Sequence, residues 1–538
     1  MDETSDKQSF GKGFVILTAA GLLIKVLSVF YNPLLRRILG EEGVGIYSSV
    51  YYVFNFVYVI GNTGLPSAIS KNISELLALQ RYKDAVNAFK ITRLFLFALG
   101  LFLSLSLFAF AGPISKMFGN SSIKIGLQVL SPTLFITCLL SCYRGYFQGR
   151  GNVKPTAVSQ IFEQVFNVVF SLLIAYLLLK YGDIELGVAG ATTGTTIGAI
   201  VALLILISYY NKDKTIRVSK INAKEKVQKR KALLLKKVIK YSIPMTICVL
   251  IQNMGMLFDN IIASRILPTM GMNADALVGN VFNYNSLVGV PIAIITSLSV
   301  VVLPAISRFA ALDDMKNLRK NTFYAYKLTF LVSVPCAVGL MSLSGPICKI
   351  LGYNSVIVNL LVLGVLNIVL MSVAQIQVSI LQGFGKINVV TFHSFFGLVC
   401  KIVADIVFIR MPFFNIYGIL IGNFVYYLVP ILMNSLSIRR TLRCKIKMAK
   451  RIFLIVVSSV LMGAAAILCH RVVSFVFGLI SKHVYINNVI ATVISIVVGA
   501  IVYVFVLTVT KSIRKKDFDV FPKKLLKVIP SFIKNRLT

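Results

Sequence analysis

Long apolar runs separated by short polar segments restrict the fold of this chain more than any other feature. A helix needs roughly 20 apolar residues to cross the hydrocarbon core of a bilayer, and the sequence holds such runs throughout its length. The predicted spans are 13–35, 47–69, 94–118, 123–147, 156–179, 186–209, 243–267, 276–306, 324–347, 356–381, 389–409, 416–436, 452–473 and 484–509. Since backbone polar groups inside a bilayer must be satisfied within the protein, these runs predict an all-α polytopic membrane protein with about 14 transmembrane helices.

Composition supports this class and argues against a nucleic-acid-binding protein. Hydrophobic residues make up 57% of the 538 residues, and the mean hydropathy is +0.83. A formal net charge of +37 would indicate nucleic acid as the partner of a soluble chain. Here lysine and arginine are concentrated between the apolar runs, where they meet anionic lipid headgroups. We therefore expect membrane lipids, and no nucleic acid, among the partners.

The distribution of lysine and arginine also predicts the orientation. Segments that follow even-numbered spans are basic, namely 71–90, 150–154, 211–240, 308–327 and 439–451. Segments that follow odd-numbered spans are short and poorer in positive charge. By the positive-inside rule, both termini and the segment 211–240 are expected in the cytoplasm of a multi-pass protein of the cell membrane.

The two blocks on either side of the basic segment 211–240 can be laid over each other in order. The matching stretches are 32–39 with 260–267, 65–71 with 303–308, 110–119 with 342–352, and 146–153 with 380–387. Four matches in register indicate an internal duplication. Each half holds six predicted spans, so both halves enter the membrane from the same side, as in transporters with parallel repeats.

This duplication predicts two six-helix lobes related by a pseudo-twofold axis, plus two extra C-terminal helices, with a cavity between the lobes. The predicted parts are an N-terminal lobe 1–210, a cytoplasmic basic linker 211–240, a C-terminal lobe 241–437, two additional transmembrane helices in 438–510, and a basic cytoplasmic tail 511–538. The apolar stretch 233–240 within the linker is expected to lie on the membrane as an amphipathic helix.

The sequence carries no pattern typical of an enzyme, such as a Gly-rich phosphate loop, paired catalytic carboxylates or a nucleophile with its base. Its three histidines, His393, His470 and His483, are isolated, which favours structural histidines over metal ligands. The eight cysteines are scattered without metal-ligand spacing, and this predicts free thiols. We expect a monomeric protein without catalysis, metal or cofactor, in which a coupling ion stays an open alternative.

Ionisable side chains inside the spans are the candidate functional residues, because each costs several kcal/mol unless it meets a partner or a wet cavity. Lys25 lies about twelve residues into the first span, near mid-membrane at a rise of 1.5 Å per residue. Its expected role is a cation that faces the cavity and attracts an anionic substrate. Pairing with a nearby carboxylate, or extension of the side chain toward the interface, is the alternative.

Near the outer end of the first span, Asn32 and Arg37 correspond to Asn260 and Arg265 in the second half. Arg37 and Arg265 are expected to form a second anion-binding site. Asp259 is expected to keep the affinity of Arg265 for the anion from becoming too high. Arginines at a span end also serve as interfacial anchors, and this alternative stays open.

Two pairs of polar residues lie one helical turn apart, and therefore on one helix face: Glu163 with Asn167, and Lys401 with Asp405. Polar contacts within each lobe, including a Lys401–Asp405 ion pair, are favoured over contact with a substrate. Asn62 has the same two interpretations, either a cavity residue or a hydrogen bond between helices.

Two segments resemble a known family: KVLSVFYNPLLRRILGEEGVGIY (25–47) and RGYFQGRGNVKPTAVSQIFEQ (144–164). They are similar to the polysaccharide-biosynthesis branch of the multidrug/oligosaccharidyl-lipid/polysaccharide exporters, in particular to its stage V sporulation protein B type, which is related to the lipid II flippases. The resemblance covers the whole chain and adds Arg144 to the substrate-binding candidates. Asn167 and Tyr31 depart from arginines of the family pattern, so the resemblance indicates a substrate class rather than lipid II itself.

The resemblance implies a V-shaped pair of lobes that flips an undecaprenyl-pyrophosphate-linked saccharide, a peptidoglycan precursor or a related glycan, from the inner to the outer leaflet by alternating access. It also implies a groove for the lipid tail at the last two spans. One alternative is a cation-coupled multidrug antiporter of the same superfamily, which favours acidic intramembrane residues. A membrane-embedded glycosyltransferase or polymerase is the other, and it requires a larger exposed loop than this sequence has.

Overall fold

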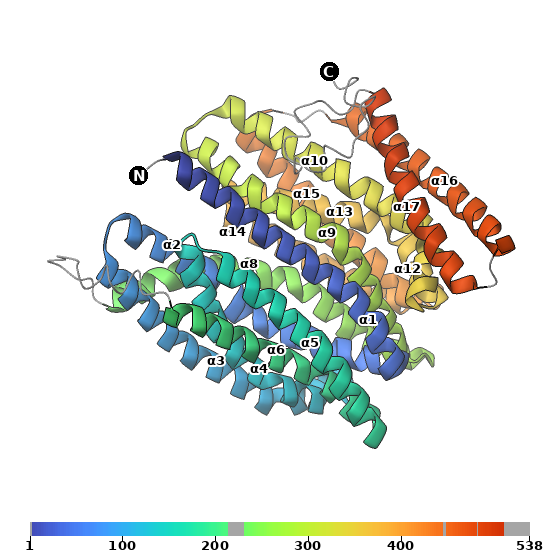
Figure 1. Ribbon diagram of the computed structural model, residues 1–538, viewed down its shortest axis with the longest axis horizontal. Coiled ribbons are helices and arrows are strands. Elements are labelled where there is room, and N and C mark those ends of the chain that lie inside the picture. Colours follow the sequence, from blue (N-terminus) through green and yellow to red (C-terminus); the bar gives the residue numbers. More distant parts are fainter. Residues whose placement is uncertain (1–2, 213–230, 445–447, 481–482, 511–538) are drawn as a thin grey trace. The chain divides into compact units, whose positions relative to one another are not determined.

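The computed structural model describes residues 3–212, 231–444, 448–480 and 483–510, and every regular element within those ranges is helical (Figure 1). The all-α prediction is therefore confirmed. Most of the predicted basic linker and the tail 511–538 lie outside the described residues. Residues 231–240 of that linker form the first turns of a helix that continues through the seventh predicted span.

The chain divides into two compact units, each of which is discontinuous in sequence. The first comprises Met1–Val290 and Ile387–Val429, and the second Pro291–Lys386 and Pro430–Thr538. This division is separate from the sequence repeat, and the superposition of the halves 1–210 and 241–437 stays a prediction. Helices α9 (Ala274–Ala311) and α15 (Gly418–Leu442) each contain a boundary, at Pro291 and Pro430. A proline inside a helix removes one backbone hydrogen bond, so both helices are weakened there.

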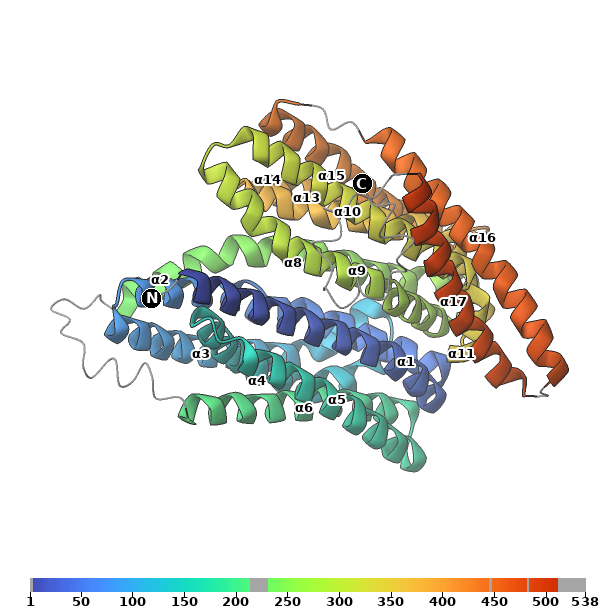
Figure 2. The ribbon, with the colours of Figure 1, turned by 45° about the horizontal axis from the view of Figure 1, so that its top comes forward.

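The other helices of the first unit are α1 (Glu3–Asn62), α2 (Gly64–Ala78), α3 (Tyr82–Phe118), α4 (Ile123–Gly149), α5 (Lys154–Tyr181), α6 (Ile184–Lys212), α8 (Lys231–Ile266), η1 (Leu267–Met270), α14 (Ile387–Ile409) and η2 (Asn415–Tyr417). Those of the second unit are α10 (Met315–Ser342), α11 (Ser344–Leu351), α12 (Ser355–Leu363), α13 (Val365–Gly383), α16 (Ala449–Ile480) and α17 (Val484–Val509). Within the second unit, α16 and α17 lie side by side (Figures 1 and 2).

Within the described residues, twelve helical stretches are long and apolar enough to cross a membrane. One of them, Leu23–Ala78, contains residues 23–35 of the first predicted span and the whole of the second. Between those spans Gly40 has φ 73° and ψ −176°, a conformation open to glycine alone, so the helix is interrupted where the sequence predicts a connection. The predicted span 243–267 is helical within α8 but is not among the twelve, because polar residues such as Asn253 and Asp259 interrupt its apolar surface.

A ridge of glycines joins α5 to α6 and fixes the position of several polar residues. Gly190, Gly194 and Gly198 recur every four residues on one face of α6. A Cβ atom at Gly194 would lie 2.2 Å from the Ser171 hydroxyl oxygen, and one at Gly198 would lie 2.4 Å from the Glu163 carbonyl oxygen. Small residues at this spacing let membrane helices approach closely. The backbone of α5 around Glu163 is thus held against α6.

Candidate functional site

A fully buried group of charges joins α8, α14 and α15 in the first unit. The Lys401 ammonium on α14 lies 2.5 Å from an Asp259 carboxylate oxygen on α8 and 3.3 Å from an Asp405 carboxylate oxygen one turn along α14. It also donates a hydrogen bond of 2.8 Å to the Asn423 side-chain oxygen on α15. We call Asp259, Lys401 and Asp405 the charge triad; its members are 0–4% exposed.

The triad holds two carboxylates against one ammonium, so its formal charge is −1 when all three groups are ionised. Neither Asp405 side-chain oxygen accepts a hydrogen bond from a described residue. Gly422 on α15 makes this packing possible, because a Cβ atom there would lie 1.7 Å from an Asp405 oxygen. The Tyr426 hydroxyl donates to the carbonyl oxygen of Gln252 over 3.1 Å, which ties α15 to α8 beside the triad.

The triad confirms one sequence prediction, because the predicted Lys401–Asp405 ion pair is present. Asp259, which was expected to moderate the binding of an anion by Arg265, pairs with Lys401. Arg265 donates to the carbonyl oxygen of Met117, at 2.8 Å, and to that of Lys116. These carbonyls end α3, where a helix lacks intrahelical donors and favours a cation.

A second ion pair joins α4 to α5. The Arg144 guanidinium donates to the Glu163 carboxylate, and Arg144 is 8% exposed. One turn along, the Asn167 side-chain oxygen accepts hydrogen bonds from Ser171, at 2.9 Å, and from Thr195 on α6, at 3.3 Å. These contacts match the expected polar contacts within one lobe, and the charge of Arg144 is balanced locally.

Polar side chains also connect α1 to α8 within the first unit. The Ser49 hydroxyl donates to the Asn260 side-chain oxygen over 2.8 Å, and the Asn260 amide donates to Ser48 over 3.3 Å. Further along, the Asn55 amide donates to the Asn253 side-chain oxygen over 3.2 Å. The predicted substrate-binding residue Asn260 is thus 2% exposed and engaged between two helices.

Asn62 near the end of α1 contacts α4. Its amide donates to the Thr137 hydroxyl over 3.2 Å and to the Tyr58 carbonyl over 3.3 Å, and its oxygen accepts from Ser141. All these groups lie in one unit, so a hydrogen bond between helices, one of the two interpretations of Asn62, is what the structure contains.

Two candidates on α1 have no such local partner. Lys25 and Arg37 are both exposed, and neither forms an ion pair or hydrogen bond with any described residue. They lie about 18 Å apart along the helix at 1.5 Å per residue. Asn32, between them, is 5% exposed. Next to Arg37, the Arg36 guanidinium is paired with Glu41, so the two neighbouring arginines differ in their environment.

Sequence reasoning missed Asn423, Ser48 and Ser49 as partners of candidate residues. A polar residue on an apolar span is a signal for such contacts, but Asn423 and Lys401 lie on different helices, so no short-range spacing links them. The described part of the chain also contains no group of three or more His, Cys, Asp or Glu side chains arranged to hold a metal ion.

Comparison with known proteins places these features in a family context. A family model described as "Polysaccharide biosynthesis protein" matches residues 10–310. The Stage V sporulation protein B of Bacillus subtilis (strain 168) is 25% identical over 451 residues, covering 82% of this chain and 86% of that protein. The Lipid II flippase MurJ of the same organism is 24% identical over 519 residues, covering 92% of this chain and 94% of that protein.

Solved structures share the fold. The lipid II flippase MurJ in an inward closed conformation has a TM-score of 0.64 and 17% sequence identity, covering 92% of this chain and 98% of that chain. A multidrug resistance MATE family transporter of the MOP superfamily, in an inward-facing conformation, has a TM-score of 0.65 and 15% identity, covering 80% of this chain and 98% of that chain. The predicted class of polytopic helical membrane protein is therefore confirmed.

Proposed function

The chain belongs to the family of polysaccharide biosynthesis proteins, and we propose that it is an alternating-access flippase for an undecaprenyl-pyrophosphate-linked saccharide. The substrate, a peptidoglycan precursor or a related glycan, moves from the inner to the outer leaflet. The relatives named as a lipid II flippase and a stage V sporulation protein support this class of substrate. Both termini of the protein lie in the cytoplasm under this proposal, and the protein acts as a monomer.

The observation that carries the proposal is Lys25. An ionised group in an apolar span is costly without a partner or a wet surface, and Lys25 is exposed without a partner among the described residues. A lipid pyrophosphate has to cross with its charged head sheltered from hydrocarbon, so a fixed cation at this depth supplies the attraction that the crossing requires. Arg37, which is exposed about 18 Å further along α1, is a second anion-binding site toward the outer side.

Other intramembrane cations are less suited to this role because their charges are already balanced. Arg144 is paired with Glu163, and Lys401 with two aspartates. Arg265 is bound to the carbonyl end of α3. Arg144, Glu163 and Arg265 of the predicted substrate-binding set, together with Asn62 and Asn260, therefore connect helices of the first unit.

The test is a series of substitutions at Lys25, assayed by the amount of lipid-linked sugar that reaches the outer leaflet in cells depleted of other flippases. Lys25→Ala is expected to lower transport at least about tenfold, which corresponds to about 1.4 kcal/mol. Lys25→Arg should retain part of the activity, and Lys25→Glu should be worse than alanine because repulsion is added to lost attraction.

Lys180 provides a matched control, because it is an exposed lysine in the last turn of α5. Lys180→Ala and Lys180→Glu are expected to transport normally. Full transport by both Lys25→Ala and Lys25→Glu, at normal abundance in the membrane, would show that Lys25 takes no part in the mechanism.

One observation favours a second function, a cation-coupled antiporter. The charge triad has one carboxylate more than it has ammonium groups, and acidic intramembrane residues are what coupling to a cation requires. Membrane vesicles with an imposed proton or sodium gradient would distinguish the two. Gradient-driven efflux of a cationic dye, lost in Asp405→Asn, would favour the antiporter, whereas transport of lipid-linked sugar without dye efflux would favour the flippase.

A further inference from the structure

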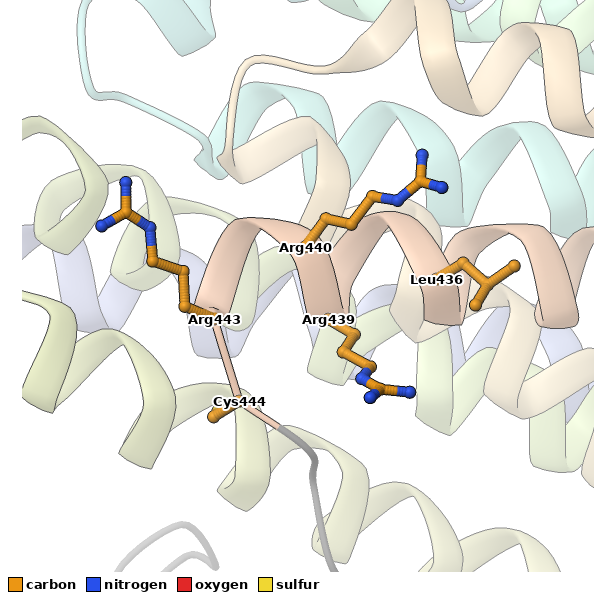
Figure 3. Close-up of a pocket in the computed structure, with 5 residues that line it drawn as sticks. All are labelled: Leu436, Arg439, Arg440, Arg443 and Cys444. Carbon is orange, nitrogen blue, oxygen red and sulfur yellow. The ribbon is translucent and has the colours of Figure 1, made fainter.

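The end of α15 forms a basic hollow in the second unit. It has a volume of about 610 Å³ and is lined by Leu436, Arg439, Arg440, Arg443 and Cys444 (Figure 3). The three arginines are exposed, and none of them forms an ion pair or hydrogen bond with a described residue. We call this group of Arg439, Arg440 and Arg443, with the space between them, the arginine hollow. None of its residues is among the intramembrane candidates discussed above.

The arginine hollow gathers three positive charges at the end of one helix. Leu436 lies three and four residues before Arg439 and Arg440, and Arg443 follows the last residue of α15 with a φ of 49°. Three like charges so close together at one helix end repel one another. The dipole of α15 favours cations at its C-terminus by about 0.3–1 kcal/mol each, but it does not require three. Figure 3 shows the three side chains pointing away from one another, with Arg439 and Arg440 on opposite sides of the helix ribbon, and all three line the hollow.

Two other cations hold this helix end in place. The Arg319 side chain of α10 donates to the Leu442 carbonyl oxygen over 2.9 Å, and the Lys386 ammonium donates to the Thr441 hydroxyl over 2.8 Å. Arg319 thus satisfies one carbonyl of the helix end, and the arginines of the hollow donate to no described residue. Their donors are available to a ligand.

Apolar side chains precede Arg440 on the same face of α15. Leu432 is 57% exposed and Leu436 is 54% exposed, at four-residue spacing before Arg440. An apolar surface that changes to a cationic one within two helical turns matches a lipid, whose chain ends where its phosphate begins. A free sugar phosphate has no apolar chain that could contact the leucines.

We propose that the arginine hollow binds the diphosphate of a polyprenyl-linked saccharide at the membrane surface, with Leu432 and Leu436 against the first part of the lipid chain. This inference rests on the proposed function and adds a capture site to it. Forked guanidinium groups bind phosphate oxygens in pairs, and three of them suit a diphosphate better than a phosphodiester with a single negative charge. Capture would occur before the headgroup meets Lys25.

The first measurement is retention of undecaprenyl diphosphate by the purified full-length protein, followed by native mass spectrometry. The variant Arg439→Gln/Arg440→Gln/Arg443→Gln is expected to retain at least about tenfold less of this lipid than the wild type. The corresponding triple lysine variant should retain an intermediate amount, because it keeps the charge and loses the paired hydrogen bonds. Retention by the glutamine variant equal to that of the wild type, or no retention by the wild type, would overturn the proposal.

A matched control removes three exposed lysines of the same unit, Lys316, Lys320 and Lys450. The variant with glutamine at all three positions should retain the lipid as the wild type does. Phosphatidylglycerol and inorganic pyrophosphate serve as competitors. Equal competition by phosphatidylglycerol would indicate an unselective anionic surface, and equal competition by pyrophosphate would remove the lipid chain from the ligand; either result overturns the proposal.

Transport measurements separate this inference from the proposed function. The triple glutamine variant should need more lipid for half-maximal transport while keeping the same maximal rate, whereas Lys25→Ala should lose the maximal rate and keep normal retention. A wild-type protein that retains the lipid in the hollow but transports none would refute the flippase and leave the binding site. Normal transport with unchanged retention in the triple variant would refute the binding site alone.

Discussion

Replacement of Lys401 by methionine tests how the charge triad is balanced. Methionine keeps most of the side-chain volume but removes the ammonium that lies 2.5 Å from Asp259 and 3.3 Å from Asp405. Two carboxylates would then share one buried site without a cation. Removing one partner of a buried ion pair costs about 3–5 kcal/mol, so Lys401→Met should be strongly destabilising.

Asp405→Asn should behave differently, because the site then keeps one ammonium and one carboxylate. The shorter contact, between Lys401 and Asp259, stays intact, and Asp405 accepts no hydrogen bond from a described residue that would be lost. A cost of about 1 kcal/mol or less is expected, since only the longer contact, between Lys401 and Asp405, changes from an ion pair to a contact with a neutral amide. The variant that combines Lys401→Met, Asp259→Asn and Asp405→Asn should regain part of the stability lost in Lys401→Met, since it buries no charge.

Thermal unfolding in detergent provides the assay. The sequence contains no tryptophan, but Cys138, Cys142 and Cys248 are buried in the first unit, where the triad also lies. A thiol-reactive dye that fluoresces on reaction therefore reports unfolding of this unit, after accessible thiols have been blocked in the folded protein. For a cooperative unit of a few hundred residues, a loss of 3–5 kcal/mol lowers the melting temperature by about 5 °C or more.

The ordering of the variants is the critical result. A melting temperature of Lys401→Met within about 1 °C of the wild type would refute the reasoning, because the ammonium would then contribute no net stability. An Asp405→Asn variant as unstable as Lys401→Met would refute the view that one carboxylate is in excess.

Three further predictions concern helix packing and helix ends. Gly194→Leu should prevent stable folding, because even a Cβ atom would lie 2.2 Å from the Ser171 oxygen; yield and monodispersity in detergent would show this, and a normal protein would contradict the close packing of α5 and α6. Arg265→Gln should lower stability by about 1–2 kcal/mol, since it removes charge-assisted bonds to the end of α3; an unchanged melting temperature would exclude that capping role. Asp314, the N-cap of α10, accepts from the Asn317 amide over 3.1 Å. Asp314→Ala should increase hydrogen exchange in the first turn of α10. This hydrogen bond lowers the pKa of Asp314, so the cap should persist at neutral pH and weaken only as pH falls below the ordinary carboxyl range; equal exchange in Asp314→Ala and the wild type would contradict the cap.

The sequence by itself determined the helical class and the pattern of spans. Apolar runs of bilayer length leave the backbone no other way to satisfy its hydrogen bonds, so helix formation follows from local composition. The Lys401–Asp405 pair was also predictable from the sequence, because a four-residue spacing places two side chains on one helix face. Gly40 interrupts α1 in the segment that the sequence assigns to the connection between two spans.

Only the tertiary structure decided which polar groups meet across helices. Asp259 pairs with Lys401, Arg265 binds the end of α3, and Asn260 contacts Ser49. These partners are far apart in sequence, and their meeting depends on how α1, α3, α8 and α14 pack within one unit. Helix periodicity places a residue on a face but does not say which helix covers that face. For that reason the sequence did not predict that Asp259 and Asn260 contact other helices, while Lys25 and Arg37 lie on an exposed surface of α1.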